Sequence, residues 1–150
     1  MSERQEPTEH WKPAATTLRR VVPVAQKRHA SGLTVALSYL EIHEGGNGFL
    51  RFLMRQDRPT RRRALMSPGL ELRVRDGSGR PLETREDGSG SSMESSYATL
   101  ASHASLLVFG LPDSGDIEVE VLRVVELDEY GRTREEGPSW EGPWTFRFRV

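Results

Sequence analysis

The segment 144–150 reads WTFRFRV, and large apolar side chains alternate with polar ones along its whole length. Segments 70–75 (LELRVR) and 117–121 (IEVEV) repeat the same alternation. Successive side chains of a strand point to opposite faces of a sheet, so each segment would have one buried and one solvated face. This pattern is typical of antiparallel sheets that pack one face on a core, and it predicts an all-β protein.

Other segments extend the pattern. Segment 33–39 alternates in the same way, whereas 49–54 (Arg51 apart) and 106–111 are apolar on both faces, as strands in the middle of a packed sheet would be. Segment 18–25 is expected at a sheet edge, because Pro23 cannot donate a hydrogen bond to a neighbouring strand. Only segment 93–103 suggests a short helix.

Turn residues separate these segments. Gly, Asp, Asn, Ser and Pro gather at 43–48, 76–79, 112–115 and 128–131, where they favour turns. Two long loops are expected, an arginine-rich one at 56–68 and a mobile Gly- and Ser-rich one at 85–96. Strands at this spacing predict an immunoglobulin-like antiparallel β-sandwich of seven to nine strands, with a closed barrel as the alternative. The alternation assigns eight residues to the core: Val35, Leu37, Leu72, Val74, Val119, Val121, Phe146 and Phe148.

The 150 residues suit one domain, which we expect to occupy 17–150 after a disordered N-terminal arm at 1–16. The chain has no cysteine, so disulfides and thiolate sites are excluded. Segment 1–12 lacks the apolar region of a secretory signal, and the longest apolar run, 106–111, is far shorter than the ~20 residues of a membrane helix. These features predict a cytoplasmic protein that does not bind membranes.

Residues with catalytic potential form no known motif. The four histidines, at 10, 29, 43 and 103, lack the spacing of metal ligands, and no nucleophile elbow or phosphate-binding glycine loop is present. A net charge of −1 argues against general attraction to nucleic acid. We therefore expect a protein that is not an enzyme and that uses no metal, cofactor or nucleic acid.

The residues proposed to contact a partner are Arg61, Arg62, Arg63 and Trp140. The three arginines, with two more at 55 and 58, form the strongest local charge cluster. The simplest interpretation is a solvated loop. The alternative is a site for a phosphate, an acidic partner or nucleic acid, although no aromatic residues lie between the arginines to stack on bases. Strand phase buries Trp144, so only Trp140 is free to be exposed.

The order of segments resembles a known class of domain. GNGFLRFL at 46–53, VRDGSG at 74–79, a Ser-rich stretch with Tyr97 and Leu100, and the strands at 106–111, 117–125 and 144–150 carry the resemblance. It is to the immunoglobulin-like β-sandwich domains of unknown function in bacterial anti-sigma-factor-like proteins. The resemblance implies no catalytic residue. Those proteins carry a membrane helix ahead of the domain, and this sequence shows none.

These observations predict a non-enzymatic bacterial interaction module that binds a protein partner or itself. The alternative is a domain that binds a small ligand or a carbohydrate. Segment 144–150 has no proline after Pro143, so we expect it to form an unprotected sheet edge that could pair with another strand.

Overall fold

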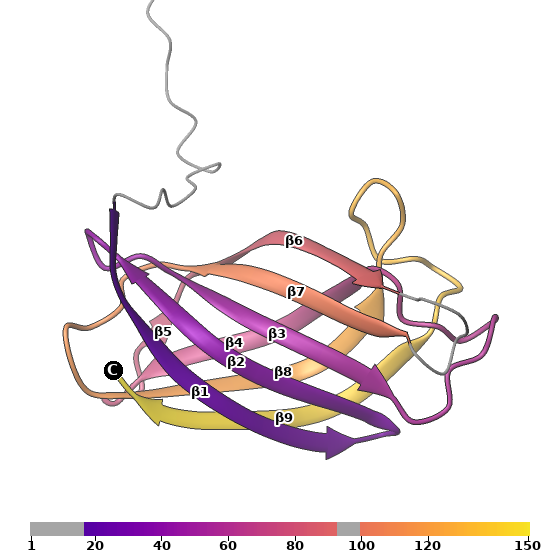
Figure 1. Cartoon of the computed structure of the whole chain (residues 1–150), viewed down its shortest axis with the longest axis horizontal. Helices are drawn as coiled ribbons and strands as arrows, with labels where there is room; N and C mark the ends of the chain where they lie inside the picture. The colour runs from indigo at the N-terminus through magenta and orange to yellow at the C-terminus, as the bar shows by residue number, and fades with distance from the viewer. Residues whose placement is uncertain (1–16, 93–99) are drawn as a thin grey trace, which may run out of the picture.

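The computed structural model describes residues 17–92 and 100–150, which form nine strands (Figure 1). The arm at 1–16 lies outside the described residues. The strands are β1 (Leu18–Ala30), β2 (Leu33–His43), β3 (Gly48–Gln56), β4 (Pro68–Asp76), β5 (Pro81–Leu82), β6 (Thr84–Ser92), β7 (Ala101–Val108), β8 (Asp116–Glu126) and β9 (Ser139–Arg149).

The strands make two antiparallel sheets that lie face to face (Figure 1). One sheet has the order β1-β2-β3-β7-β6 and the other has the order β5-β4-β8-β9. The prediction of an antiparallel β-sandwich is therefore confirmed, and the sheets do not close into one barrel. In the described part of the chain, no helix has the length and apolar character needed to cross a membrane.

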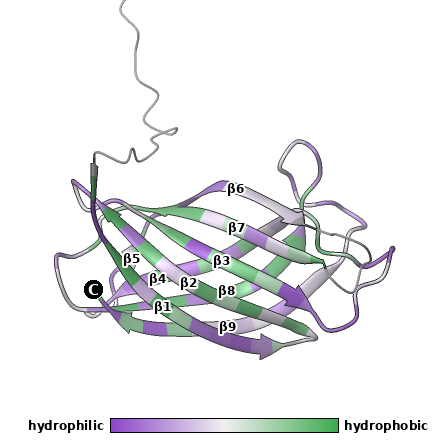
Figure 2. Ribbon diagram, in the orientation of Figure 1, coloured by the Kyte–Doolittle hydropathy of each residue, from purple (hydrophilic) through white to green (hydrophobic). Residues whose placement is uncertain are grey.

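The core lies between the two sheets, where the apolar positions of the alternating strands meet (Figure 2). Of the eight residues assigned to it from the sequence, six are fully buried, while Leu72 and Phe148 are partly buried against it. Phe52 of one sheet packs edge-to-face on Phe146 of the other, with ring centroids 6.3 Å apart. Trp144 is buried as expected, and its indole Nε1 donates to the carbonyl of Leu33 across the sandwich at 3.1 Å.

Strand β6 corrects the prediction of a mobile loop at 85–96 over residues 85–92, and residues 93–96 of that prediction lie outside the described residues. Residues 84–92 pair with β7 over their whole length, with one irregularity between Glu86 and Gly88. The Gly- and Ser-rich sequence shows no alternation of apolar and polar side chains, because Gly and Ser contribute little to a core. The segment forms a strand because β7 provides hydrogen-bond partners for its backbone. The expected helix at 93–103 is also wrong from Ala101 onward, where β7 begins; its residues 93–99 lie outside the described chain.

Strands β1 and β9 lie at neighbouring edges of the two sheets. Both edge positions agree with the sequence predictions. Three β1-side residues donate to carbonyls of β9: Gln26 to Arg147 at 2.8 Å, Arg28 to Thr145 at 3.0 Å, and Ser31 to Glu141 at 2.6 Å. Segment 144–150 is therefore an edge, but two of its carbonyls, those of Thr145 and Arg147, already accept hydrogen bonds within the molecule.

Candidate binding site at the arginine loop

The arginine loop, residues 57–67, joins β3 to β4 at the same end of the sandwich as the β8–β9 connection (Figure 1). Its ends are tied together by Gln56, the last residue of β3. The Gln56 amide donates to the carbonyl of Arg63 at 2.7 Å and accepts from the amide of Leu65 at 2.8 Å. Within the loop, the hydroxyl of Thr60 accepts from the amide of Arg63 at 3.1 Å. The loop thus has a defined shape set by its own hydrogen bonds.

A buried carboxylate anchors the second half of the loop. The two oxygens of Glu126 on β8 accept from the amides of Met66 and Ser67, both at 2.8 Å, and only 4% of Glu126 is exposed. The side chain of Leu65 is buried in the core, and its carbonyl accepts from Ser102 of β7 at 2.5 Å. The arginines are therefore presented from a fixed frame.

The structure brings two of the four predicted contact residues together. The guanidinium of Arg63 lies over the Trp140 ring, 4.9 Å from its centroid, and donates to the carbonyl of Ser139 at 3.0 Å. Arg63 remains exposed, whereas Trp140 is only 2% exposed. The expectation that Trp140 is free for a partner is therefore wrong. Strand β9 begins at Ser139, earlier than expected, and places Trp140 opposite Val124 on the core face.

Beside this stack is an open recess of about 360 Å³, which we call the arginine recess. Its lining comprises Ser31, Gly32, Gln56, Asp57, Arg58, Arg63 and Trp140. The one carboxylate of this lining, Asp57, is paired with His29 at 2.9 Å. The two lining guanidinium groups are therefore left to face solvent, and the recess can accept an anionic group.

The other arginines of this region are unpaired. In residues 17–92 and 100–150, Arg55, Arg58, Arg61 and Arg62 take part in no ion pair or hydrogen bond of their side chains. On the four-stranded sheet, by contrast, several arginines are matched with carboxylates, as in the pair of Arg147 with Glu118 at 2.9 Å. The positive charge of the arginine loop is thus concentrated and not neutralised by nearby acids. Arg61 and Arg62 lie outside the recess lining.

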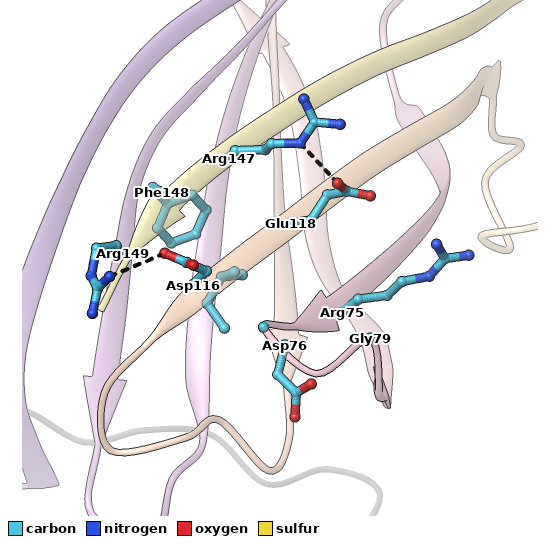
Figure 3. A pocket seen from close by; sticks show the side chains of 10 residues that line it. Arg75, Asp76, Gly79, Asp116, Glu118, Arg147, Phe148 and Arg149 are labelled. Atoms are coloured by element: carbon cyan, nitrogen blue, oxygen red, sulfur yellow. Dashed lines mark hydrogen bonds and ion pairs between the residues drawn. The ribbon is translucent and has the colours of Figure 1, made fainter.

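A larger recess lies elsewhere, on the four-stranded sheet near the C-terminus of the described chain (Figure 3). This sheet-end recess has a volume of about 620 Å³, and its lining carries three arginines and three acids. Arg147 pairs with Glu118 at 2.9 Å and Arg149 with Asp116 at 3.7 Å. Its charges largely satisfy each other, so it has less capacity than the arginine loop to attract a charged partner.

Strongly perturbed titratable groups do not gather at either recess as a catalytic pair would. Asp76 lines the sheet-end recess, and hydrogen bonds, first that from the Ser78 hydroxyl, lower its pKa to about 2, but the other described groups with a shifted pKa lie outside that lining. On β6 and β7, burial raises the pKa of Glu86, and burial followed by the charge of Arg51 lowers the pKa of His103. Within the described residues, no group of three His, Cys, Asp or Glu side chains is placed to hold a metal ion.

Comparison with protein-family models gives no match, and comparison with curated proteins gives none. Among solved structures, the chain is similar to the conserved domain protein from Bacillus anthracis, with a TM-score of 0.54 and 9% sequence identity. The similarity covers 87% of this chain and 48% of that protein, so this chain spans about half of its length. At this identity the likeness shows a shared fold and nothing about activity.

Proposed function

We propose that this protein is a non-enzymatic interaction module that binds an acidic segment of a protein partner at the arginine loop. The observation that carries the proposal is the set of four unpaired arginines, at 55, 58, 61 and 62, next to a fifth that is held in place on Trp140. The bacterial origin and the immunoglobulin-like classification suggested by the sequence resemblance belong to this proposal.

The chemistry of arginine supports an acidic partner. A guanidinium group presents several donors in a planar fork that matches a carboxylate, and it keeps its charge at every physiological pH. Arg63 is already oriented by its stack on Trp140 and its bond to Ser139, so little side-chain freedom would be lost on binding. The flexible, unpaired arginines around it would supply attraction and adapt to the sequence of the partner.

The proposal is tested by calorimetric titration with a hexaglutamate peptide at about 0.15 M ionic strength, with a hexaserine peptide as the control ligand. We expect binding of hexaglutamate only. Simultaneous replacement of Arg58, Arg61 and Arg62 by Ser should weaken it about tenfold. Three exposed ion pairs of ~0.5 kcal/mol each sum to ~1.5 kcal/mol, and 1.4 kcal/mol corresponds to a factor of ten.

A control variant removes the same number of positive charges from the four-stranded sheet instead of the arginine loop. Replacement of Arg73, Arg147 and Arg149 by Ser deletes three arginines of the four-stranded sheet, two of which line the sheet-end recess. This variant should bind hexaglutamate as the wild type does. Loss of binding in this variant alone would move the site to the sheet-end recess. Equal loss in both variants would show attraction by net charge without a site, and either outcome would contradict the proposal.

A further inference from the structure

The four sheet edges of the sandwich are protected to very different degrees. An edge strand exposes unpaired backbone groups, which proteins cover or interrupt to prevent pairing with other chains. Strand β1 carries Pro23 and a register shift between Pro23 and Gln26, and β5 is only two residues long. Three carbonyls of β9 accept hydrogen bonds from Gln26, Arg28 and Ser31.

Strand β6 lacks these protections over its second half. Gly88–Ser92 pairs without interruption with β7, and no strand of the described chain pairs with its other side, although β4 of the opposite sheet lies near β6. Gly88 and Ser89 are exposed, and a methyl group built on Gly88 would meet no atom within 4 Å. Between them and Pro68 and Leu127 lies a recess of about 200 Å³, so these neighbours do not pack tightly on this part of β6.

The charge pattern of β6 is suited to pairing with a copy of itself. All its charges, Arg85, Glu86 and Asp87, precede the uncharged run 88–92. In antiparallel pairing of 88–92 with the same run of a second molecule, Ser89 of each molecule would lie opposite Ser91 of the other. The charged segments 85–87 of the two molecules would then lie at opposite ends of the paired strands. Parallel pairing would instead place like charges side by side, which is unfavourable. A two-fold axis generates the antiparallel arrangement directly.

We propose that β6 is a self-association edge, through which two molecules join their five-stranded sheets by antiparallel pairing of residues 88–92. Small side chains at these positions let the two backbones approach, and the cross-strand serines can exchange hydrogen bonds. The run 88–92 meets the arginine loop where the Ser91 hydroxyl donates to Sδ of Met66 at 3.9 Å, but it includes none of the arginines of that loop. Dimerisation and the binding of an acidic partner are therefore tested by different variants.

The proposal is tested by light scattering at protein concentrations up to about 1 mM. The chain has a mass of 16.9 kDa, and the measured mass should rise with concentration toward twice that value. Ser89→Lys places two positive charges near the two-fold axis and should keep the protein monomeric. Ser114→Lys, in the exposed β7–β8 loop, adds the same charge elsewhere and should dimerise like the wild type.

Cross-linking tests the location directly. Because the chain has no cysteine, Ser89→Cys and Ser114→Cys each carry one thiol. A short bismaleimide should link two molecules of Ser89→Cys and leave Ser114→Cys unlinked. A wild type that stays monomeric up to about 1 mM would overturn the proposal. So would a dimer that persists in Ser89→Lys, or equal cross-linking of the two cysteine variants.

Discussion

Glu126 shows how one side chain can determine the shape of a functional loop. Its carboxylate satisfies two amides of the arginine loop from a position that is 96% buried, since 4% of it is exposed. A buried acceptor with two partners is costly to remove, because the amides of Met66 and Ser67 would then lack hydrogen bonds. The frame that presents the arginines thus depends on a residue that would never touch the partner.

Replacement of Glu126 by Ala should lower the free energy of unfolding by about 1–3 kcal/mol, because two amides of the loop lose their acceptor at ~0.5–1.5 kcal/mol each. Glu126→Gln keeps one acceptor oxygen and should lose roughly half as much. Urea unfolding measures both variants, and hydrogen exchange should show faster exchange at Met66 and Ser67. Wild-type stability of Glu126→Ala would refute the anchoring role.

In the β4–β5 turn, as in the arginine loop, one carboxylate holds the backbone in its shape. The side chain of Asp76 accepts hydrogen bonds from the Ser78 hydroxyl and from the amides of Ser78 and Arg80, and it pairs with the Arg80 guanidinium at 3.1 Å. These bonds stabilise the ionised carboxylate, and they lower the pKa of Asp76 from its ordinary 3.8 to about 2. A depressed pKa contributes stability above pH 3.8 that is lost as the pH falls through 2.

Asp76→Asn should therefore lower stability at neutral pH and remove part of the acid dependence between pH 4 and pH 2. Urea unfolding at a series of pH values gives the free-energy profile of each protein. Asp113→Asn removes an exposed carboxylate from the next loop and should keep the profile of the wild type. Parallel profiles for Asp76→Asn and the wild type would show that the turn does not hold the carboxylate ionised.

Strands in which apolar and polar side chains alternate were predictable from the sequence. A strand that forms only because its backbone pairs with a neighbouring strand was not. The strand that contains Phe148 and the strand that contains Val119 follow the alternation, because one face of each packs on the core. Strand β6 was missed because Gly88 and Ser89 give no apolar signal, and β7 supplies its hydrogen-bond partners. For the site, the arginine cluster was visible in the sequence, but the stack of Arg63 on Trp140 joins residues 77 positions apart (140 − 63).

The whole molecule consists of two sheets joined mainly through large side chains. Phe146 is fully buried and meets Phe52 of the opposite sheet, whereas Phe148 is only partly buried near the sheet end. Removal of a buried ring loses its transfer free energy and leaves a cavity between the sheets. The sandwich should therefore tolerate truncation of Phe148 much better than truncation of Phe146.

Phe146→Ala should lower the free energy of unfolding by about 3–5 kcal/mol. Phe148→Ala, two residues further along the same strand, should cost clearly less, because part of its ring is already in water. Urea unfolding of the two variants gives the comparison. Equal losses would mean that the two rings contribute alike to the packing between the sheets.

The four-stranded sheet and the arginine loop differ in how their charges are paired. The outer face of the four-stranded sheet is lined with cross-strand ion pairs, such as Arg73 with Glu120. The arginine loop at one end carries cations without such partners in the described chain. The near-zero net charge of −1 hides this local excess, and it explains why composition alone did not indicate an anion-binding surface.

The central claim, that the arginine loop binds an acidic partner segment, is tested most directly by NMR of the side-chain N–H groups during titration with hexaglutamate. The arginine Nε–Hε groups of Arg58, Arg61, Arg62 and Arg63 should shift together and saturate, with a smaller shift at the indole of Trp140 beneath Arg63. The arginines at 73, 147 and 149, paired on the four-stranded sheet, should not move. Shifts at the paired arginines with none at the loop, or no saturable shift at all, would contradict the claim.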